Sequence, residues 1–465
     1  MGIPGRTRGL PVAGEPQPSP TRWIALAAVL LTPGLACWKS PQPQPDERDP
    51  APVVAADLTL YRFARVIPEP GTVIEGGAVL VEGKIFREIL TGDRAPPPGA
   101  RIVDLSRYTA IPGLIDVHTH LSFCWDPSWG ERAPADPFSI TSTKERLAPL
   151  VAENARRVLE IGITTVRDLG SNHNLDLDLA KQIEAGEAVG PRIFGAGDGI
   201  WSPLLNPDGV AEGSLGEAAG PEAVAAMVRR EAAAGSRVIK LWASTGSDDD
   251  LSGRRTYSYE EIKAGVDAAH ALGLTVAVHD TLGEVTEDIV RAGADSVEHP
   301  RHIAPELLVK MRERGVTYVP TIYHNIYYRD NIDRFGFSPD RRAAFDDFIA
   351  DNVATARAAH KAGVNIAMGS DAVFTAFGQN TRELDMFVHD VGMTPMEALA
   401  TATTNAARLL RVDDRLGAIR PGYLADMVVL DGDFSRIEDI HAVVMVIKEG
   451  AVVVDKLAPA APAAP

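Results

Sequence analysis

Cysteine is scarce in this chain of 465 residues, which has only Cys37 and Cys124. Two thiols provide no disulfide framework. Basic residues are also in the minority, because 46 lysines and arginines stand against 63 aspartates and glutamates, a formal net charge of −17. This balance is unfavourable for binding nucleic acid or an anionic membrane surface. We therefore expect no nucleic-acid partner and one large domain with additions, as the length of the chain indicates.

The N-terminal apolar run, WIALAAVLL at residues 23–31, is too short to span a bilayer comfortably and has the length of a signal-peptide core. Arginines precede the run, and small residues follow it up to Cys37. We expect residues 1–37 to be a signal peptide with a lipoprotein cleavage site, and the protein to be exported, either periplasmic or membrane-anchored through a lipidated Cys37. Ordinary signal cleavage near Ala36, with an incidental cysteine, is the alternative.

Composition divides the rest of the chain. Residues 38–54 are polar and proline-rich, which predicts an extended tether. Short β-like runs separated by turn signals fill residues 55–111 and return at 415–456. Neither piece is long enough to bury a core alone, so we expect both chain ends to form one small β-sandwich domain. Residues 457–465, rich in alanine and proline, are expected to be disordered.

Residues 112–414 alternate short strand-like runs with amphipathic segments, several of which end at glycine, a helix C-terminal signal. Repeated alternation of this kind predicts an α/β fold, a (β/α)₈ TIM barrel. The active site of such a barrel lies at the C-terminal ends of its strands.

Metal-binding residue types stand at those strand ends. In a strand, residues two apart point to the same side, so both imidazoles of the first strand can meet one ion. A single strand histidine is more often structural, but this many together indicate a site for zinc or a similar divalent ion. The residues are His118, His120, Lys240, His279, His299 and Asp371.

The pattern resembles the metal-dependent amidohydrolase superfamily, in particular its imidazolonepropionase-like and prolidase-like members. The resemblance extends from about residue 56 to residue 455. It rests on PGLIDVHTH (112–120), TTVRDLG (164–170), IKLWASTG (239–246), VAVH (276–279), DSVEH (295–299), VPT (319–321), MGSDA (368–372), GMTPMEALATATTNAARLL (392–410) and PGYLADMVVLD (421–431).

The resemblance implies two divalent metal ions, expected to be Zn²⁺. His118 and His120, with Asp371, would hold the more buried ion, and His279 and His299 would hold the second. A hydroxide bridging the ions would attack the substrate carbonyl, and Asp371 would pass the proton to the leaving nitrogen.

Lys240 lies in the apolar run RVIKLWAS, at residues 237–244. One interpretation is an edge strand whose lysine points to water, since buried lysines are rare without a partner. The resemblance implies instead that carbon dioxide carboxylates Lys240, which then bridges the metals. A free lysine, with a pKa of about 10.4, would repel metal ions, whereas a carbamate is anionic.

Tyr323 resembles a family tyrosine that hydrogen-bonds the substrate carbonyl, although a packed rim aromatic is the alternative. His324 is a weaker candidate for the same rim. Three features depart from the family pattern on the substrate side: Asp280, Pro300 and the run FGQN at residues 377–380. An insertion at residues 199–216 is expected to fold over the pocket. The acidic run at residues 248–250 is either a solvated loop or part of the rim, where it would favour a cationic substrate.

Three functions remain open. The first is hydrolysis of an amide bond in a small molecule, a dipeptide or N-acyl amino acid. The second is hydrolysis or deamination of a cyclic amide or ring amine; Lys240 counts against a mononuclear deaminase, which needs no bridging ligand. The third is a non-catalytic solute-binding lipoprotein, against which the intact ligand set counts. A homo-oligomer is compatible with the sequence.

Overall fold

The computed structural model describes residues 58–92, 94–130, 142–204, 216–245, 251 and 253–457. The predicted signal peptide with Cys37, the tether, the acidic run at 248–250, most of the insertion at 199–216 and the tail from residue 458 lie outside these residues. No helix within the described ranges is long and apolar enough to cross a bilayer.

The strands are β1 (Leu58–Glu69), β2 (Thr72–Glu75), β3 (Ala78–Glu82), β4 (Ile85–Leu90), β5 (Arg101–Pro112), β6 (Leu114–Thr119), β7 (Ile163–Asp168), β8 (Arg192–Gly195), β9 (Ile200–Trp201), β10 (Gly216–Glu217), β11 (Val238–Trp242), β12 (Thr275–His279), β13 (Ser296–Glu298), β14 (Thr317–Val319), β15 (Met427–Leu430), β16 (Val443–Lys448) and β17 (Ala451–Asp455).

The α-helices are α1 (Lys144–Glu160), α2 (Leu175–Glu184), α3 (Pro221–Ala234), α4 (Tyr259–Ala271), α5 (Glu284–Ala292), α6 (Pro305–Arg314), α7 (Ile322–Asp330), α8 (Ile332–Phe335), α9 (Arg341–Ala362), α10 (Arg382–Met386), α11 (Pro395–Thr401) and α12 (Thr404–Leu409). Two of them show how the sequence sets their ends. A capping box of Ser258 and Glu261 begins α4, and Gly315, in the left-handed conformation, ends α6.

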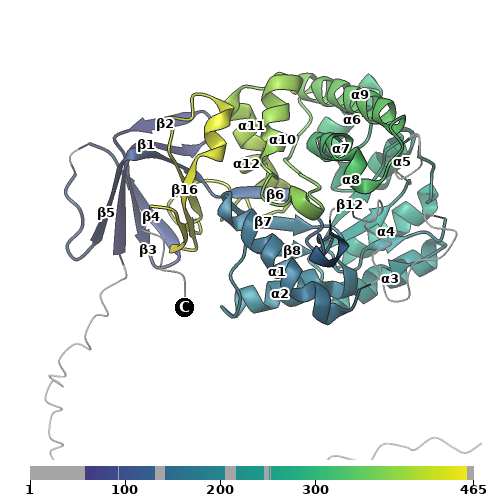
Figure 1. Cartoon of the computed structure of the whole chain (residues 1–465), viewed down its shortest axis with the longest axis horizontal. Coiled ribbons are helices and arrows are strands. Elements are labelled where there is room, and N and C mark those ends of the chain that lie inside the picture. The colour runs from purple at the N-terminus through teal and green to yellow at the C-terminus, as the bar shows by residue number, and fades with distance from the viewer. Residues whose placement is uncertain are drawn as a thin grey trace, which may run out of the picture. The chain divides into compact units, whose positions relative to one another are not determined.

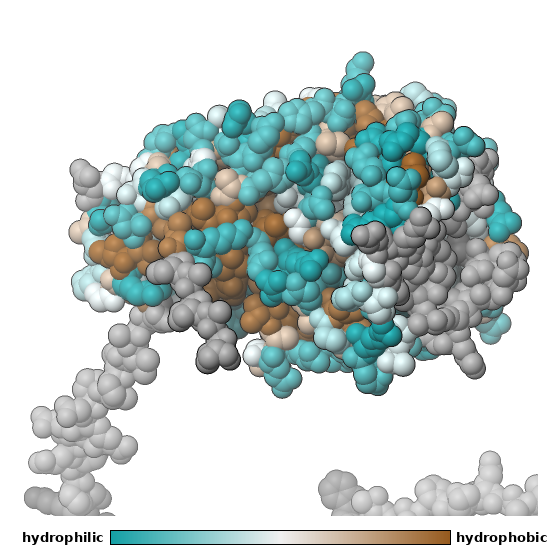
Figure 2. All heavy atoms as spheres, viewed as in Figure 1, coloured by the Kyte–Doolittle hydropathy of each residue, from teal (hydrophilic) through white to brown (hydrophobic). Residues whose placement is uncertain are grey.

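Strands from both ends of the chain share one eight-stranded sheet, in the order β17-β16-β15-β5-β1-β3-β4, with β2 paired to β1. The junction is the antiparallel pairing of β15 with β5, in which Met427 lies opposite Pro112. Figure 1 shows this sheet beside the helix-rich part of the chain. In the same orientation, hydrophobic residues gather on that side of the molecule (Figure 2). The exposed ones on these strands include Ile85, Ile102 and Val452.

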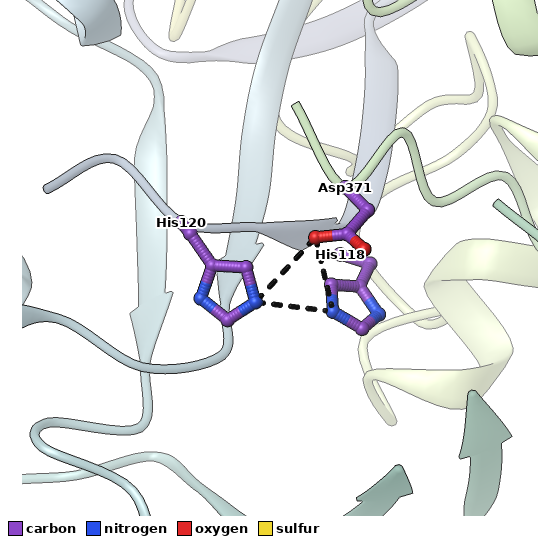
Figure 3. Close-up of side chains that lie close together, drawn as sticks. All are labelled: His118, His120 and Asp371. Atoms are coloured by element: carbon purple, nitrogen blue, oxygen red, sulfur yellow. Dashed lines mark hydrogen bonds and ion pairs between the residues drawn. The ribbon is translucent and has the colours of Figure 1, made fainter. Parts of the chain in front are cut away.

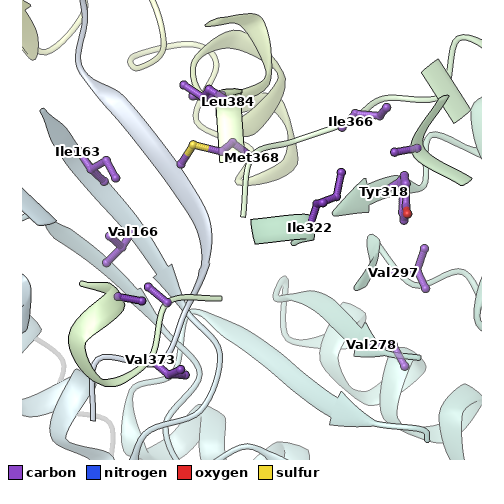
Figure 4. Packing of buried hydrophobic residues seen from close by; sticks show 14 of the residues in the cluster. Ile163, Val166, Val278, Val297, Tyr318, Ile322, Ile366, Met368, Val373 and Leu384 are labelled. Atoms are coloured by element: carbon purple, nitrogen blue, oxygen red, sulfur yellow. The ribbon is translucent and has the colours of Figure 1, made fainter. Parts of the chain in front are cut away.

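The middle of the chain forms two parallel sheets, β6-β7-β8 and β10-β9-β11-β12-β13-β14. Helices α1 to α7 lie between or after these strands in the chain, as the alternating pattern predicts. Buried Val278, Val297 and Tyr318 on neighbouring strands pack in the hydrophobic core (Figure 4). The closed barrel and the β-sandwich, with the domain boundaries assigned from the sequence, stay predictions.

The alternating pattern over residues 112–414 predicts a strand at residues 365–371, but this segment does not form a regular strand. This segment makes only isolated parallel bridges, Tyr318 with Ile366 and Thr119 with Ala372. The segment lies between β14 and β6. The main-chain amide of Tyr318 donates to the Asn365 carbonyl, and the main-chain amide of Val117 donates to the Met368 carbonyl. At the end of the segment the backbone is left-handed, since Asp371 has a φ of +49°.

Candidate metal centre and catalytic site

Three predicted ligands meet at the C-terminal end of β6. The Nε2 atoms of His118 and His120 lie 3.3 Å apart, and the Asp371 Oδ1 atom lies 3.7 Å and 3.5 Å from them. Figure 3 shows the two rings and the carboxylate directed at one another. Two atoms that each lie 2.0–2.1 Å from a tetrahedral ion are about 3.3–3.4 Å apart. The group therefore has the spacing and the chemistry to hold one metal ion.

A buried carboxylate orients His118. The His118 Nδ1 atom lies 2.8 Å from Glu298 Oε2, and the other Glu298 oxygen accepts a hydrogen bond of 2.9 Å from Arg167. Both Arg167 and Glu298 have side chains that are 0% exposed. Because Nδ1 must donate to the carboxylate, Nε2 keeps the lone pair that faces Asp371. The sequence analysis missed this pair, although charged residues inside apolar strands were a signal.

The other histidines are held similarly. His120 Nδ1 lies 3.0 Å from the Gly170 carbonyl oxygen, which leaves its Nε2 directed at Asp371. A Cβ on Gly170 would lie 2.8 Å from the Trp242 ring and 3.5 Å from the His120 ring, so only glycine permits this close packing. His299 Nδ1 lies 2.6 Å from the Thr321 hydroxyl and 3.9 Å from Asp371 Oδ2.

His279 is the ligand candidate most clearly in need of a partner. Its Nε2 is shielded from solvent and has no hydrogen-bond partner among the described residues. Its ring centroid lies 4.8 Å from that of His299, which in turn lies 4.7 Å from that of His118. Orphaned buried nitrogen atoms are rare because they lose their hydration without compensation.

Lys240 points into this group, and the edge-strand interpretation is wrong. Its side chain is buried in the interior strand β11, between β9 and β12, and Nζ lies 3.5 Å from His118 Nε2. Nζ also lies 5.0 Å from the centre of the Trp242 ring. Burial lowers the pKa of Lys240 to about 8, against the opposing charges of Glu298 and Asp371.

Burial, together with the charge of Lys240, lowers the pKa of His120 to about 3 and that of His118 well below its usual value. The pKa values of His279 and His299 are lowered well below normal mainly by burial. Neutral imidazole is the form that binds metal. The electrostatics therefore favour the protonation state that a metal site needs.

The backbone around Asp371 is fixed by neighbouring side chains. Asp116 accepts hydrogen bonds from the Ser370 amide, the Ser370 hydroxyl and the Asn380 amide group. A Cβ on Gly369 would lie 2.6 Å from the His118 Cβ, so glycine allows the segment to approach β6. Burial raises the pKa of Asp116 to about 6, despite these hydrogen bonds.

The rim candidates come from α7. His324 Nδ1 lies 2.7 Å from the Asp371 carbonyl oxygen and 3.4 Å from its Oδ2, closer to the site than its sequence suggested. The Tyr323 hydroxyl donates to Gln379 Oε1 at 2.8 Å. Both residues line a pocket with Asp371 and Gln379. Glu383, which the sequence analysis missed, accepts from the Tyr323 amide and fixes the start of α7.

Two of the three departures from the family pattern, Asp280 and Pro300, are explained by contacts within the protein. Asp280 is buried and accepts hydrogen bonds from the Thr286 hydroxyl and the Leu282 amide. The Pro300 carbonyl accepts from the Tyr318 hydroxyl at 3.1 Å. In the third departure, by contrast, Gln379 and Asn380 line the pocket. Cys124 is a free, buried thiol.

The chain is similar to a family model, to known enzymes and to solved structures. A model of the amidohydrolase family matches residues 109–453. Ochratoxinase of Aspergillus niger is 28% identical over 424 residues, which are 85% of this chain and 85% of the relative. Imidazolonepropionase of Symbiobacterium thermophilum is 25% identical over 433 residues, 84% of this chain and 92% of the relative. A crystal structure of a Xaa-Pro dipeptidase with methionine bound in the active site superposes with a TM-score of 0.77 at 30% identity, covering 85% of this chain and 99% of that one.

Proposed function

The chain belongs to the amidohydrolase family, whose members of this kind hydrolyse carbon–nitrogen bonds, and on that premise we propose that it cleaves the amide bond of a dipeptide or N-acyl amino acid with two divalent metal ions. We propose Zn²⁺ for both ions, His118, His120 and Asp371 as ligands of one, and His279 and His299 as ligands of the other. The grouping of His118, His120 and Asp371 carries the proposal.

The residues fit such a centre in two further respects. His279 Nε2 is buried without a partner among the described residues, and a metal ion would satisfy it. Lys240 extends into the same group from β11. We propose that its neutral amine adds to carbon dioxide and loses one proton, which gives a carbamate with two oxygens for two cations. The lowered pKa of Lys240 favours the neutral amine that this addition requires.

When bound, the metal ions would supply Lewis-acid activation of water and of the scissile carbonyl. The remaining steps belong to the protein. The Asp371 carboxylate takes the proton of the attacking water and delivers it to the leaving nitrogen, because an amide nitrogen leaves poorly unless protonated. Burial raises the pKa of Asp371, which favours proton uptake. His324 holds the Asp371 main chain from the pocket side, and we assign Tyr323 to the substrate oxygen.

The similar solved structures support the dipeptide as a substrate. Prolidase-like structures superpose well, including a prolidase complexed with N-methylphosphonate-L-proline, with a TM-score of 0.76 and 26% identity.

We also propose that the two parallel sheets, with residues 365–372 between them, form one barrel. We further propose that the chain is exported and lipidated at Cys37. The sequence of residues 23–37 supports export.

One experiment tests the proposal. The purified protein is analysed for metal content and assayed with Xaa-Pro dipeptides, other dipeptides, N-acyl amino acids, cyclic amides and ring amines. We expect two metal ions per chain and turnover of the dipeptides or N-acyl amino acids. One ion per chain with turnover confined to cyclic amides or ring amines would favour the alternative function. A metal-loaded protein that turns over nothing in the panel would contradict both.

A further inference from the structure

A cavity of about 500 Å³ lies at the edge of the parallel sheets away from the metal centre. It is lined by Arg192, which begins β8, and by Arg237, which directly precedes β11. His118 and His279, by contrast, stand at the C-terminal ends of parallel strands. The turn between β16 and β17 adds Lys448 to the wall. Cavities of this size bind small molecules in many proteins, and the proposed hydrolysis makes no use of this one.

The wall of the cavity is rich in cations for a protein with a net charge of −17. The cationic side chains that line it are Lys84, Arg192, Arg237, Arg415 and Lys448. On the exposed rim, Arg237 pairs with Glu184 and Arg415 pairs with Asp414. The rim is therefore balanced in charge, and any excess of positive charge lies among the remaining three cations.

Lys448 is the one of these three cations that has no carboxylate within ion-pair distance in the described parts of the chain. Glu449 is shared by the other two, since one oxygen lies 2.9 Å from Lys84 Nζ and the other lies 2.8 Å from Arg192. Arg192 also lies 2.9 Å from a carboxylate oxygen of Asp426. Three positive charges thus meet two negative ones. Partly buried lysines are rare without a partner, so the excess charge belongs to Lys448.

The environment of Lys448 is unfavourable for its charge. Burial lowers the pKa of Lys448, and the charge of Arg192 lowers it further, against the opposing charges of Asp426 and Glu449. The two nearby carboxylates therefore do not compensate the ammonium for the hydration that it loses. An anion beside Lys448 would do so, because an opposite charge at short distance favours the charged form.

The wall that carries Lys448 is held in place by the main chain. The Glu449 amide donates to an Asp426 carboxylate oxygen at 2.8 Å, and the Gly450 amide donates to the Ala425 carbonyl at 3.0 Å. The turn is therefore ordered before a ligand binds, which reduces the entropic cost of binding.

Another part of the wall is apolar. Ile183 and Phe194 line the cavity, and the central carbon of the Arg237 guanidinium lies 5.7 Å from the centre of the Phe194 ring. Small-molecule sites typically combine such apolar surface with a few polar groups that fix orientation. The cavity therefore suits a ligand with both a charged group and a carbon body.

We propose that this cavity binds a small organic anion, whose phosphate or carboxylate group pairs with the Lys448 ammonium and whose carbon body lies against Phe194. The site is separate from the metal centre and does not depend on the proposed hydrolysis. Lys448 belongs to the sheet formed from both chain ends, and Arg192 belongs to a parallel sheet. A ligand held between them would stabilise the folded protein, because it binds only when both are in place.

The test is calorimetric titration of the purified, metal-loaded protein with glucose 6-phosphate and with succinate. Glucose and succinamide, which lack the charge, are the matched neutral probes. We expect at least one of the anions to bind and neither neutral probe to do so. Lys448→Met should weaken binding of that anion at least about tenfold, the usual cost of a lost charged hydrogen bond. Lys310→Met is the control, because exposed Lys310 lies on α6 and pairs with Glu287; it should change the affinity less than about twofold.

A second variant distinguishes this cavity from the metal centre, where anions can also bind. Ala185→Glu adds a carboxylate to the cavity wall at an exposed position, so the fold should be retained. It should abolish binding of the same anion while the metal content stays that of the wild type. Binding of glucose 6-phosphate alone would assign the site to phosphates, and binding of succinate alone would assign it to carboxylates. Failure of the wild type to bind either anion, or wild-type affinity in either folded variant, would overturn the proposal.

Discussion

The buried Glu298 carboxylate gives the sharpest test of how His118, a proposed metal ligand, is held. Glu298→Gln is nearly isosteric, but its side chain offers one acceptor where the wild type offers two. Oε1 accepts from Arg167 and from the Ser296 hydroxyl, while Oε2 faces His118 Nδ1. In the variant, the amide group must face either His118 or Arg167, so two donors would oppose each other.

Both effects have known sizes. A buried donor left without an acceptor costs about 1–3 kcal/mol, and removal of one partner of a buried ion pair costs about 3–5 kcal/mol. Both costs arise from the same substitution and are not additive, so we expect the metal-free protein to lose about 3–5 kcal/mol of unfolding free energy. Loss of a carboxylate behind a ligating histidine should also weaken metal binding by about 10- to 100-fold.

The assays are urea unfolding of metal-free protein and zinc titration in competition with a chelator. Asp267→Asn is the control, because the Asp267 side chain is 61% exposed and, among the residues that the structure describes, pairs only with Lys263 of the same helix. That substitution should change stability by less than about 0.5 kcal/mol. Wild-type zinc affinity in a folded Glu298→Gln protein would refute the orienting role, and wild-type stability would refute the buried ion pair.

Three further predictions follow from the same geometry. Lys240→Ala should reduce bound metal and abolish most activity, whereas Lys240→Glu should recover some metal binding; wild-type metal content in Lys240→Ala would end the binuclear proposal. Asp371→Asn should lower kcat at least ~10²-fold in metal-replete protein, the scale of a general base, and near-normal turnover would remove Asp371 from proton transfer. Glu449 is partly buried, which opposes ionisation, but hydrogen bonds from Lys84 and Arg192 hold its pKa at about 2. Since that pKa is depressed below its ordinary value of 4.5, the contribution of Glu449 to stability is present above about pH 4.5 and is lost as the pH falls toward 2. Glu449→Gln should flatten the dependence of the urea midpoint on pH in that window, and an unchanged slope would contradict the assignment.

The residues of the candidate metal centre could be predicted to lie together, because their sequence signals are local. His118 and His120 are two apart on one strand, and Lys240 is a charged residue in an apolar run. The Glu298–Arg167 pair could not be assigned in this way, because it joins β13 to β7 across 131 residues.

The segment at residues 365–371 shows why an irregular backbone suits Asp371, the residue that we propose moves a proton. A regular strand would continue its ladder through Asp371, but here the φ of +49° turns the residue out of the strand. Its position is fixed through the main chain, because its amide donates to the His118 carbonyl at 2.8 Å and its own carbonyl oxygen lies 2.7 Å from His324 Nδ1.

The carboxylate of Asp371 is left with looser contacts. Its oxygen atoms lie 3.4–3.9 Å from the nitrogen atoms of four histidines. These distances exceed those of strong charged hydrogen bonds, which are about 2.7–2.9 Å. Backbone anchoring therefore sets where the carboxylate lies without saturating its oxygen atoms. One oxygen can then coordinate a cation while the other exchanges a proton, which is the combination of tasks that the proposed hydrolysis assigns to this residue.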